Sequence, residues 1–109
     1  MKLQQDEDRF DEWQAYFSYE LLQVIKDGLE RATLPPEQVR ELTTRIGFDL
    51  ACLIDASAPF AVEGMAITPV LTFSATGSDL DDGAVLLHQG SPSSLHEYVH
   101  GNADELFGG

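Results

Sequence analysis

The chain has 109 residues, 43% of them hydrophobic, and a formal net charge of −13. This length fits one domain, and the hydrophobic share is too high for a disordered chain. No apolar run approaches the roughly 18 residues of a membrane-spanning helix, and Cys52 has no second cysteine with which to form a disulfide. We therefore expect a cytoplasmic protein that is stabilised by packing.

The first part of the chain predicts a frayed end followed by a long helix. Residues 1–8 are polar and predicted to be frayed, so that 9–109 would form a single α+β domain. After them, hydrophobic residues recur at helical spacings of three and four: Phe10, Trp13, Phe17, Leu21, Val24, Ile25 and Leu29. This pattern predicts a helix over about 9–32.

A second helix follows after a short break. Pro35 and Pro36 end the first helix because proline has no N–H to continue the hydrogen-bond ladder. Helical spacing then returns over about 36–56, in Val39, Leu42, Ile46, Leu50 and Leu53. Because the connection is short, we expect the two helices to form an antiparallel hairpin.

The period of the pattern changes from helical to alternating after Pro59. The composition of Val70–Ser74 and of Ala84–His88 predicts two antiparallel strands joined by a long loop. Apolar pieces within 60–67 indicate a third strand, so the expected sheet is small and has two or three strands. Two strands alone are marginal in water, and a homodimer is one way to cover them. The sequence leaves the oligomeric state open.

The last part of the chain reads as a short helical segment. Two patterns typical of helix starts occur there, Ser94-x-x-Glu97 and Asn102-x-x-Glu105, with Gly101 between them. Glycine and asparagine often end helices, so we expect two short helices or one broken helix. Helices first and strands later favour an α+β fold over a parallel α/β fold.

The charge is unevenly distributed along the chain. No Lys or Arg follows Arg45, whereas nine carboxylates do: Asp49, Asp55, Glu63, Asp79, Asp81, Asp82, Glu97, Asp104 and Glu105. Such a surface repels nucleic acids and anionic membranes and attracts cations and basic proteins. Self-repulsion also weakens the compact state, so moderate salt is expected to stabilise the protein.

The segment from His96 to His100 matches the pattern His-Glu-x-x-His. It resembles the signature of zincin metalloproteases, in which two histidines one helical turn apart bind zinc and the glutamate activates a water molecule. The resemblance covers five residues and implies His96 and His100 as ligands and Glu97 as general base. A third ligand is needed, and Asp104 is the nearest candidate. The alternative is a surface helix with two partly exposed histidines.

The acidic loop residues are a second candidate site. Asp79, Asp81 and Asp82 precede Gly83, but their spacing differs from a calcium-binding EF-hand loop, so a hairpin turn is the better interpretation. Their charge makes them candidates for binding a partner.

Taken together, these patterns predict a small acidic binding or accessory protein. It would dock a basic protein partner through its anionic surface, with no catalysis and no cofactor of its own, and would bind neither nucleic acid nor membrane. The alternatives are a small zinc-dependent hydrolase that uses His96, Glu97 and His100, and a structural or oligomerisation module.

Overall fold

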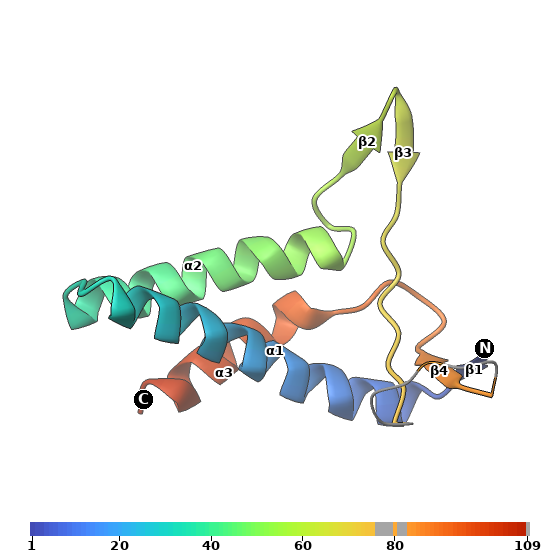
Figure 1. Ribbon diagram of the computed structural model, residues 1–109, viewed down its shortest axis with the longest axis horizontal. Helices are drawn as coiled ribbons and strands as arrows, with labels where there is room; N and C mark the ends of the chain where they lie inside the picture. The colour runs from blue at the N-terminus through green and yellow to red at the C-terminus, as the bar shows by residue number, and fades with distance from the viewer. Residues whose placement is uncertain (76–79, 81–82, 109) are drawn as a thin grey trace.

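The computed structural model describes residues 1–75, 80 and 83–108. These residues contain three α-helices, one short 3-10 helix and four short strands. The strands form two separate two-stranded sheets (Figure 1). The mixed α+β class expected from the sequence is confirmed. The expected single antiparallel sheet is not what forms, because one of the two sheets is parallel.

Two long helices, α1 (Glu7–Arg31) and α2 (Pro36–Ile54), form the body of the molecule. Figure 1 shows them side by side and antiparallel. The Asp6 side chain caps α1 by accepting a hydrogen bond from the backbone N of Arg9 at 3.1 Å. The helices approach closely at Gly47, where an added Cβ would lie 2.2 Å from a methyl carbon of Leu22.

The C-terminal segment covers one side of this hairpin. The 3-10 helix η1 (Leu95–Tyr98) passes directly into α3 (Val99–Leu106), and the two contact both long helices. The predicted helix stop at Gly101 and Asn102 is wrong, since α3 runs through both residues. The Asn102 side chain does not cap a helix. It donates from Nδ2 to the carbonyl oxygen of Ala15 in α1 at 3.1 Å, which joins the middle of α3 to α1.

The core lies where these helices meet. It is a small cluster of fully buried apolar side chains: Leu22, Ala51, Leu95, Val99 and Ala103. Polar residues of α1 continue the buried face beyond this cluster. Ser18, for example, donates from Oγ to the carbonyl oxygen of Leu95 at 3.3 Å. The terminal segment is therefore held to α1 by polar as well as apolar contacts.

The first residues of the chain are paired in a strand, which differs from the frayed end expected for them. Strand β1 (Lys2–Gln5) runs parallel to β4 (Val85–His88), in a register that places Leu3 opposite Leu86. All four β1 side chains are exposed, so the pairing rests on backbone hydrogen bonds. An open strand edge accepts such a partner whatever its side chains are.

The predicted pairing of Val70–Ser74 with Ala84–His88 is reduced to one contact. Phe73 and Leu87 form an isolated antiparallel bridge through two backbone hydrogen bonds, and no continuous strand forms over 70–74. The ring of Phe73 packs against three aromatic rings of α1, those of Phe10, Trp13 and Phe17. Side-chain packing on α1 therefore positions this segment.

The pieces within 60–67 form a hairpin of their own and do not add to the other sheet. Strands β2 (Phe60–Val62) and β3 (Met65–Ile67) are antiparallel and joined by Glu63 and Gly64, both with positive φ, as a tight two-residue turn requires. Figure 1 shows this hairpin projecting from the helical body at the end of α2. We call residues 60–67 the arm, and all eight of them are exposed.

Candidate functional site

The His-Glu-x-x-His segment spans two kinds of helix. His96 and Glu97 lie in η1, and His100 lies in the first turn of α3. The rings of both histidines border Phe48 of α2, with centroid distances of 6.0 Å for His96 and 5.6 Å for His100. His96 is partly buried, whereas Glu97 and His100 are exposed. The motif therefore lies at the contact between α2 and the C-terminal segment.

A buried carboxylate holds this segment in place. Asp55, directly after α2, is only 4% exposed. Its Oδ2 accepts hydrogen bonds from the backbone N of His96 at 2.8 Å and contacts His96 Nδ1 at 2.6 Å. Its Oδ1 accepts from the hydroxyl of Ser93 at 2.5 Å. We call these three residues the Asp55 bracket.

The arrangement of the bracket limits what it can do chemically. A serine nucleophile is activated by a base within hydrogen-bond reach of its hydroxyl, and the base is usually a histidine ring. Here the serine hydroxyl and the imidazole each bind the carboxylate, on different oxygens. The bracket therefore ties the loop before η1 to the end of α2. Sequence reasoning missed it, because Asp55 is separated from its partners by 38 and 41 residues.

The third metal ligand proposed from the sequence is engaged elsewhere. The carboxylate of Asp104 accepts a hydrogen bond from the Nη2 of Arg40 in α2 at 3.3 Å. Among the residues that the structure describes, no three or more His, Cys, Asp or Glu side chains are grouped so as to hold a metal ion. The continuous α3 helix thus places Asp104 against α2, and not in a shared site with His96 and His100.

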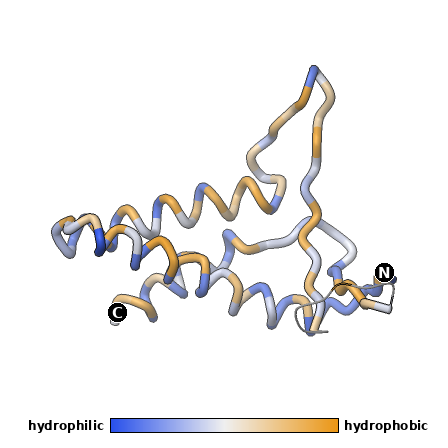
Figure 2. Tube along the Cα trace, in the orientation of Figure 1, coloured by the Kyte–Doolittle hydropathy of each residue, from blue (hydrophilic) through white to orange (hydrophobic). Residues whose placement is uncertain are grey.

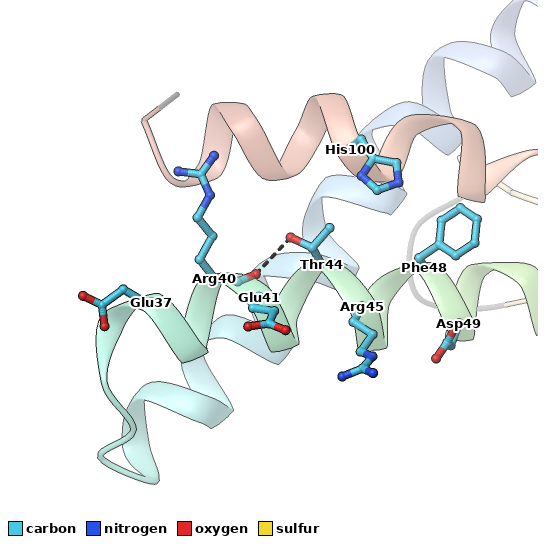
Figure 3. Close-up of a pocket in the computed structure, with 8 residues that line it drawn as sticks. All are labelled: Glu37, Arg40, Glu41, Thr44, Arg45, Phe48, Asp49 and His100. Carbon is cyan, nitrogen blue, oxygen red and sulfur yellow. Dashed lines mark hydrogen bonds between the residues drawn. The ribbon is translucent and has the colours of Figure 1, made fainter.

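A groove runs along α2 beside His100 (Figure 3). It has a volume of about 600 Å³ and is lined by Glu37, Arg40, Glu41, Thr44, Arg45, Phe48, Asp49 and His100. The Thr44 hydroxyl is turned back to the carbonyl oxygen of Arg40 at 2.9 Å, so it does not point a free donor into the groove. Charges of both signs line this groove. Sequence reasoning missed it, because His100 of α3 joins residues of α2 that are distant from it in the sequence.

A second groove is strongly acidic. The first turns of α1 present Glu7, Asp8 and Asp11, opposite polar residues of the loop before η1, to give a volume of about 340 Å³ lined also by Gln89, Ser91 and Ser94. Tyr98 donates its hydroxyl to Asp11. This hydrogen bond, together with burial and the negative charges of Asp11 and Glu97, raises the pKa of Tyr98 to about 12. Tyr98 is therefore a neutral donor at any physiological pH.

The carboxylates beyond Arg45 lie mostly at the surface. Asp79, Asp81 and Asp82, the acidic loop residues proposed from the sequence, lie outside the described residues. Six carboxylates of this half are described, and Asp55 is the buried one among them. The other five are exposed: Asp49, Glu63, Glu97, Asp104 and Glu105.

The single cysteine has none of the features of an activated thiol. Cys52 is partly buried near the end of α2. Burial raises the pKa of its thiol, and the negative charges of Asp55 and Asp49 raise it further. Because the thiolate is the reactive form, this environment disfavours nucleophilic chemistry.

The chain matches no protein-family model, no curated protein and no solved structure. Within the described ranges, none of the helices combines the length and the apolar character needed to cross a membrane. The function proposed below therefore rests on the geometry and charge of the chain itself.

Proposed function

We propose that this chain is a small protein-binding accessory protein that docks a basic protein partner through the carboxylates of its distal half. The observation that carries the proposal is the exposure of those carboxylates. Five of the six that the structure describes are exposed, and no Lys or Arg occurs after Arg45 to neutralise them. Exposed carboxylates are available to a partner, and this supports the proposal.

Three of these carboxylates lie close together in the chain. Glu97 is in η1, and Asp104 and Glu105 are in α3, on the segment that covers the helical hairpin. Arg40 pairs with Asp104 across an exposed contact, and an exposed ion pair of this kind is weak and screened by salt. Negative charge held on a rigid helix attracts a positively charged partner, raising its association rate and favouring it over neutral competitors.

The bracket geometry supports a non-catalytic role for the motif region. The Asp55 carboxylate contacts Nδ1 of His96. The Ser93 hydroxyl donates its hydrogen bond to the same carboxylate and not to the imidazole. All three residues are used to fasten the C-terminal segment to α2. Because η1 and α3 are held in one position, their surface charges keep a fixed arrangement, which lowers the entropic cost of binding a partner.

The zinc-hydrolase alternative has one specific observation in its favour. A carboxylate against one ring nitrogen of a histidine is the usual way to orient the other nitrogen toward a metal, and Asp55 stands in that relation to His96. Against it, zinc enzymes use three protein ligands, and Asp104 is directed to Arg40. Direct measurement of zinc binding separates the two proposals.

The docking proposal is tested with two variants of equal charge change. In the distal variant Glu97→Gln, Asp104→Asn and Glu105→Gln are combined. In the proximal control the exposed carboxylates of α1 are changed instead, as Glu12→Gln, Glu20→Gln and Asp27→Asn. Each protein is immobilised and exposed to cell lysate at low salt, and bound proteins are eluted at about 0.5 M NaCl, where charge attraction is screened.

We expect basic proteins to elute from the wild type and the proximal control and to be lost from the distal variant. Retention that does not depend on salt would contradict docking led by charge. Equal loss from both variants would show that net charge alone, and not the distal surface, holds the proteins. Binding of a duplex DNA probe through the distal half would contradict the electrostatic argument as a whole.

A further inference from the structure

The helical hairpin is covered on one side by η1 and α3, and its other side is open except where the ring of Phe73 packs on Trp13 and Phe17 of α1. In α2 the buried residues Gly47 and Ala51 are each preceded by an exposed apolar residue, Ile46 and Leu50. The residue after Gly47 is Phe48, which packs on the histidines of η1 and α3. Each residue turns a helix by about 100°, so Ile46 and Leu50 face the side opposite to η1 and α3.

The same offset holds in α1. Ala15 follows the buried Gln14 and accepts a hydrogen bond from Asn102 of α3. Phe17 precedes the buried Ser18 and therefore faces the open side, as does Leu21, which precedes Leu22. Since the helices are antiparallel neighbours, these residues lie on one surface. We call it the open helical face: Phe17, Leu21, Ile46, Leu50 and Leu53.

The arm carries a second open apolar surface. Its strand pairs place Phe60 opposite Ile67 and Val62 opposite Met65, and side chains alternate along a strand. These four large side chains therefore share one face of the arm, and alanines occupy the other face. Figure 2 shows apolar character along both strands, interrupted at the tip, on a hairpin that stands clear of the helices. A two-stranded hairpin with neither face covered is marginal in water.

The scarcity of charge on the arm favours a second copy as its partner. Glu63, at the tip of the arm, is the only charged residue between Asp55 and Asp79. The arm offers a basic partner only one carboxylate, whereas Glu97, Asp104 and Glu105 offer it three on η1 and α3. Two copies that each carry −13 repel one another over most of their surface and meet at least electrostatic cost where charge is scarce.

The exposed area is what a stable dimer requires. Eight side chains of the two surfaces are between 37% and 67% exposed: Phe17, Ile46, Leu50, Leu53, Phe60, Val62, Met65 and Ile67. With full areas on the order of 200 Å² each, they leave roughly 700 Å² of apolar surface per copy. Specific interfaces bury about 600–1,000 Å² per partner, so this area is sufficient.

We infer that the chain forms a symmetric homodimer in which the arm of each copy packs its apolar face on the open helical face of the other. One two-fold axis relates the two contacts, so both pairs of surfaces are covered and the assembly is closed. This inference is independent of the docking proposal, since the carboxylates tested there, Glu97, Asp104 and Glu105, lie on η1 and α3 and stay exposed.

The test measures the mass of the protein in solution by light scattering coupled to gel filtration. We expect about 24 kDa for the wild type at tens of micromolar, twice the chain mass of 12.0 kDa. Val62→Glu on the arm and Leu50→Glu on the open helical face are each expected to give about half that mass, because each buries a charge in the interface. Far-UV circular dichroism checks that both variants keep their helices.

Tyr16→Glu is the control. Tyr16 is 69% exposed and Val62 is 55% exposed, but Tyr16 lies on the side of α1 that borders α3, beside Asn102 and Glu105. It is expected to stay dimeric. A wild type of monomer mass would overturn the inference. So would a dimer that survives both Val62→Glu and Leu50→Glu, or one that Tyr16→Glu dissociates equally well.

Discussion

The replacement of Asp55 by alanine tests the bracket most directly. It removes a buried carboxylate that accepts from the Ser93 hydroxyl and from the backbone N of His96, and that contacts His96 Nδ1. A hydrogen bond to a charged group contributes about 1.5–3 kcal/mol, and a buried donor left without an acceptor costs about 1–3 kcal/mol. Water can reach the partly exposed His96 and restore part of the loss. We expect Asp55→Ala to lower the free energy of unfolding by about 3–4 kcal/mol.

The measurement is equilibrium unfolding in urea, with thermal melting as a second readout. A chain of this size loses about 4 °C of Tm per kcal/mol, so a fall of about 12–16 °C is expected. Asp49→Ala is the control, because Asp49 is an exposed carboxylate on α2, the helix that Asp55 follows, and its loss is expected to cost at most about 0.5 kcal/mol. If the two variants differ by less than about 1 kcal/mol, the bracket does not hold the C-terminal segment and the reasoning fails.

Four further outcomes are expected. Gly47→Ala should destabilise by about 1–2 kcal/mol, since the new methyl group lies 2.2 Å from Leu22, whereas Gly28→Ala, with open space around it, should stabilise by about 0.5–1 kcal/mol; urea unfolding that ranks them the other way refutes the close approach. The pKa of Tyr98 is raised from 10.0 to about 12, so the stability that its neutral hydroxyl confers is complete below pH 10 and lost as pH rises to 12; Tm should fall more steeply over that range than in Tyr98→Phe, and parallel curves would disprove the link to Asp11. Untagged protein dialysed after zinc addition should retain less than about 0.1 equivalent by elemental analysis, and a full equivalent would instead favour the hydrolase alternative. Moderate NaCl should raise Tm, because the charge of −13 repels itself, and a steady decline would count against this.

The helices were predictable from the sequence because they follow from local rules. Apolar spacing and the proline pair located α1 and α2 to within a few residues, since a helix is specified by neighbours three and four positions away. The start of β4 was also found to within one residue. These predictions from local sequence agree with the structure because the tertiary contacts favour the same elements.

What the sequence did not disclose depends on distant partners. Lys2–Gln5 has no alternating pattern, and its strand exists only because β4 offers an edge. Gly101 and Asn102 looked like a helix end, but a bond from Asn102 to α1 favours continuation, and at the end of α3 Phe107 meets the cations of Lys26 and Arg40. The Asp55 bracket could not be predicted from the sequence for the same reason. Its hydrogen bonds join residues that are about 40 positions apart in the chain.

The parallel pairing of β1 with β4 sets an order of events during synthesis. Residues 2–5 leave the ribosome about 80 residues ahead of their hydrogen-bond partners at 85–88. The helical hairpin can form in the meantime from contacts close in sequence. Pairing of β1 with β4 therefore follows formation of the helical hairpin. A pause in translation before residue 85 would leave the hairpin folded and β1 unpaired.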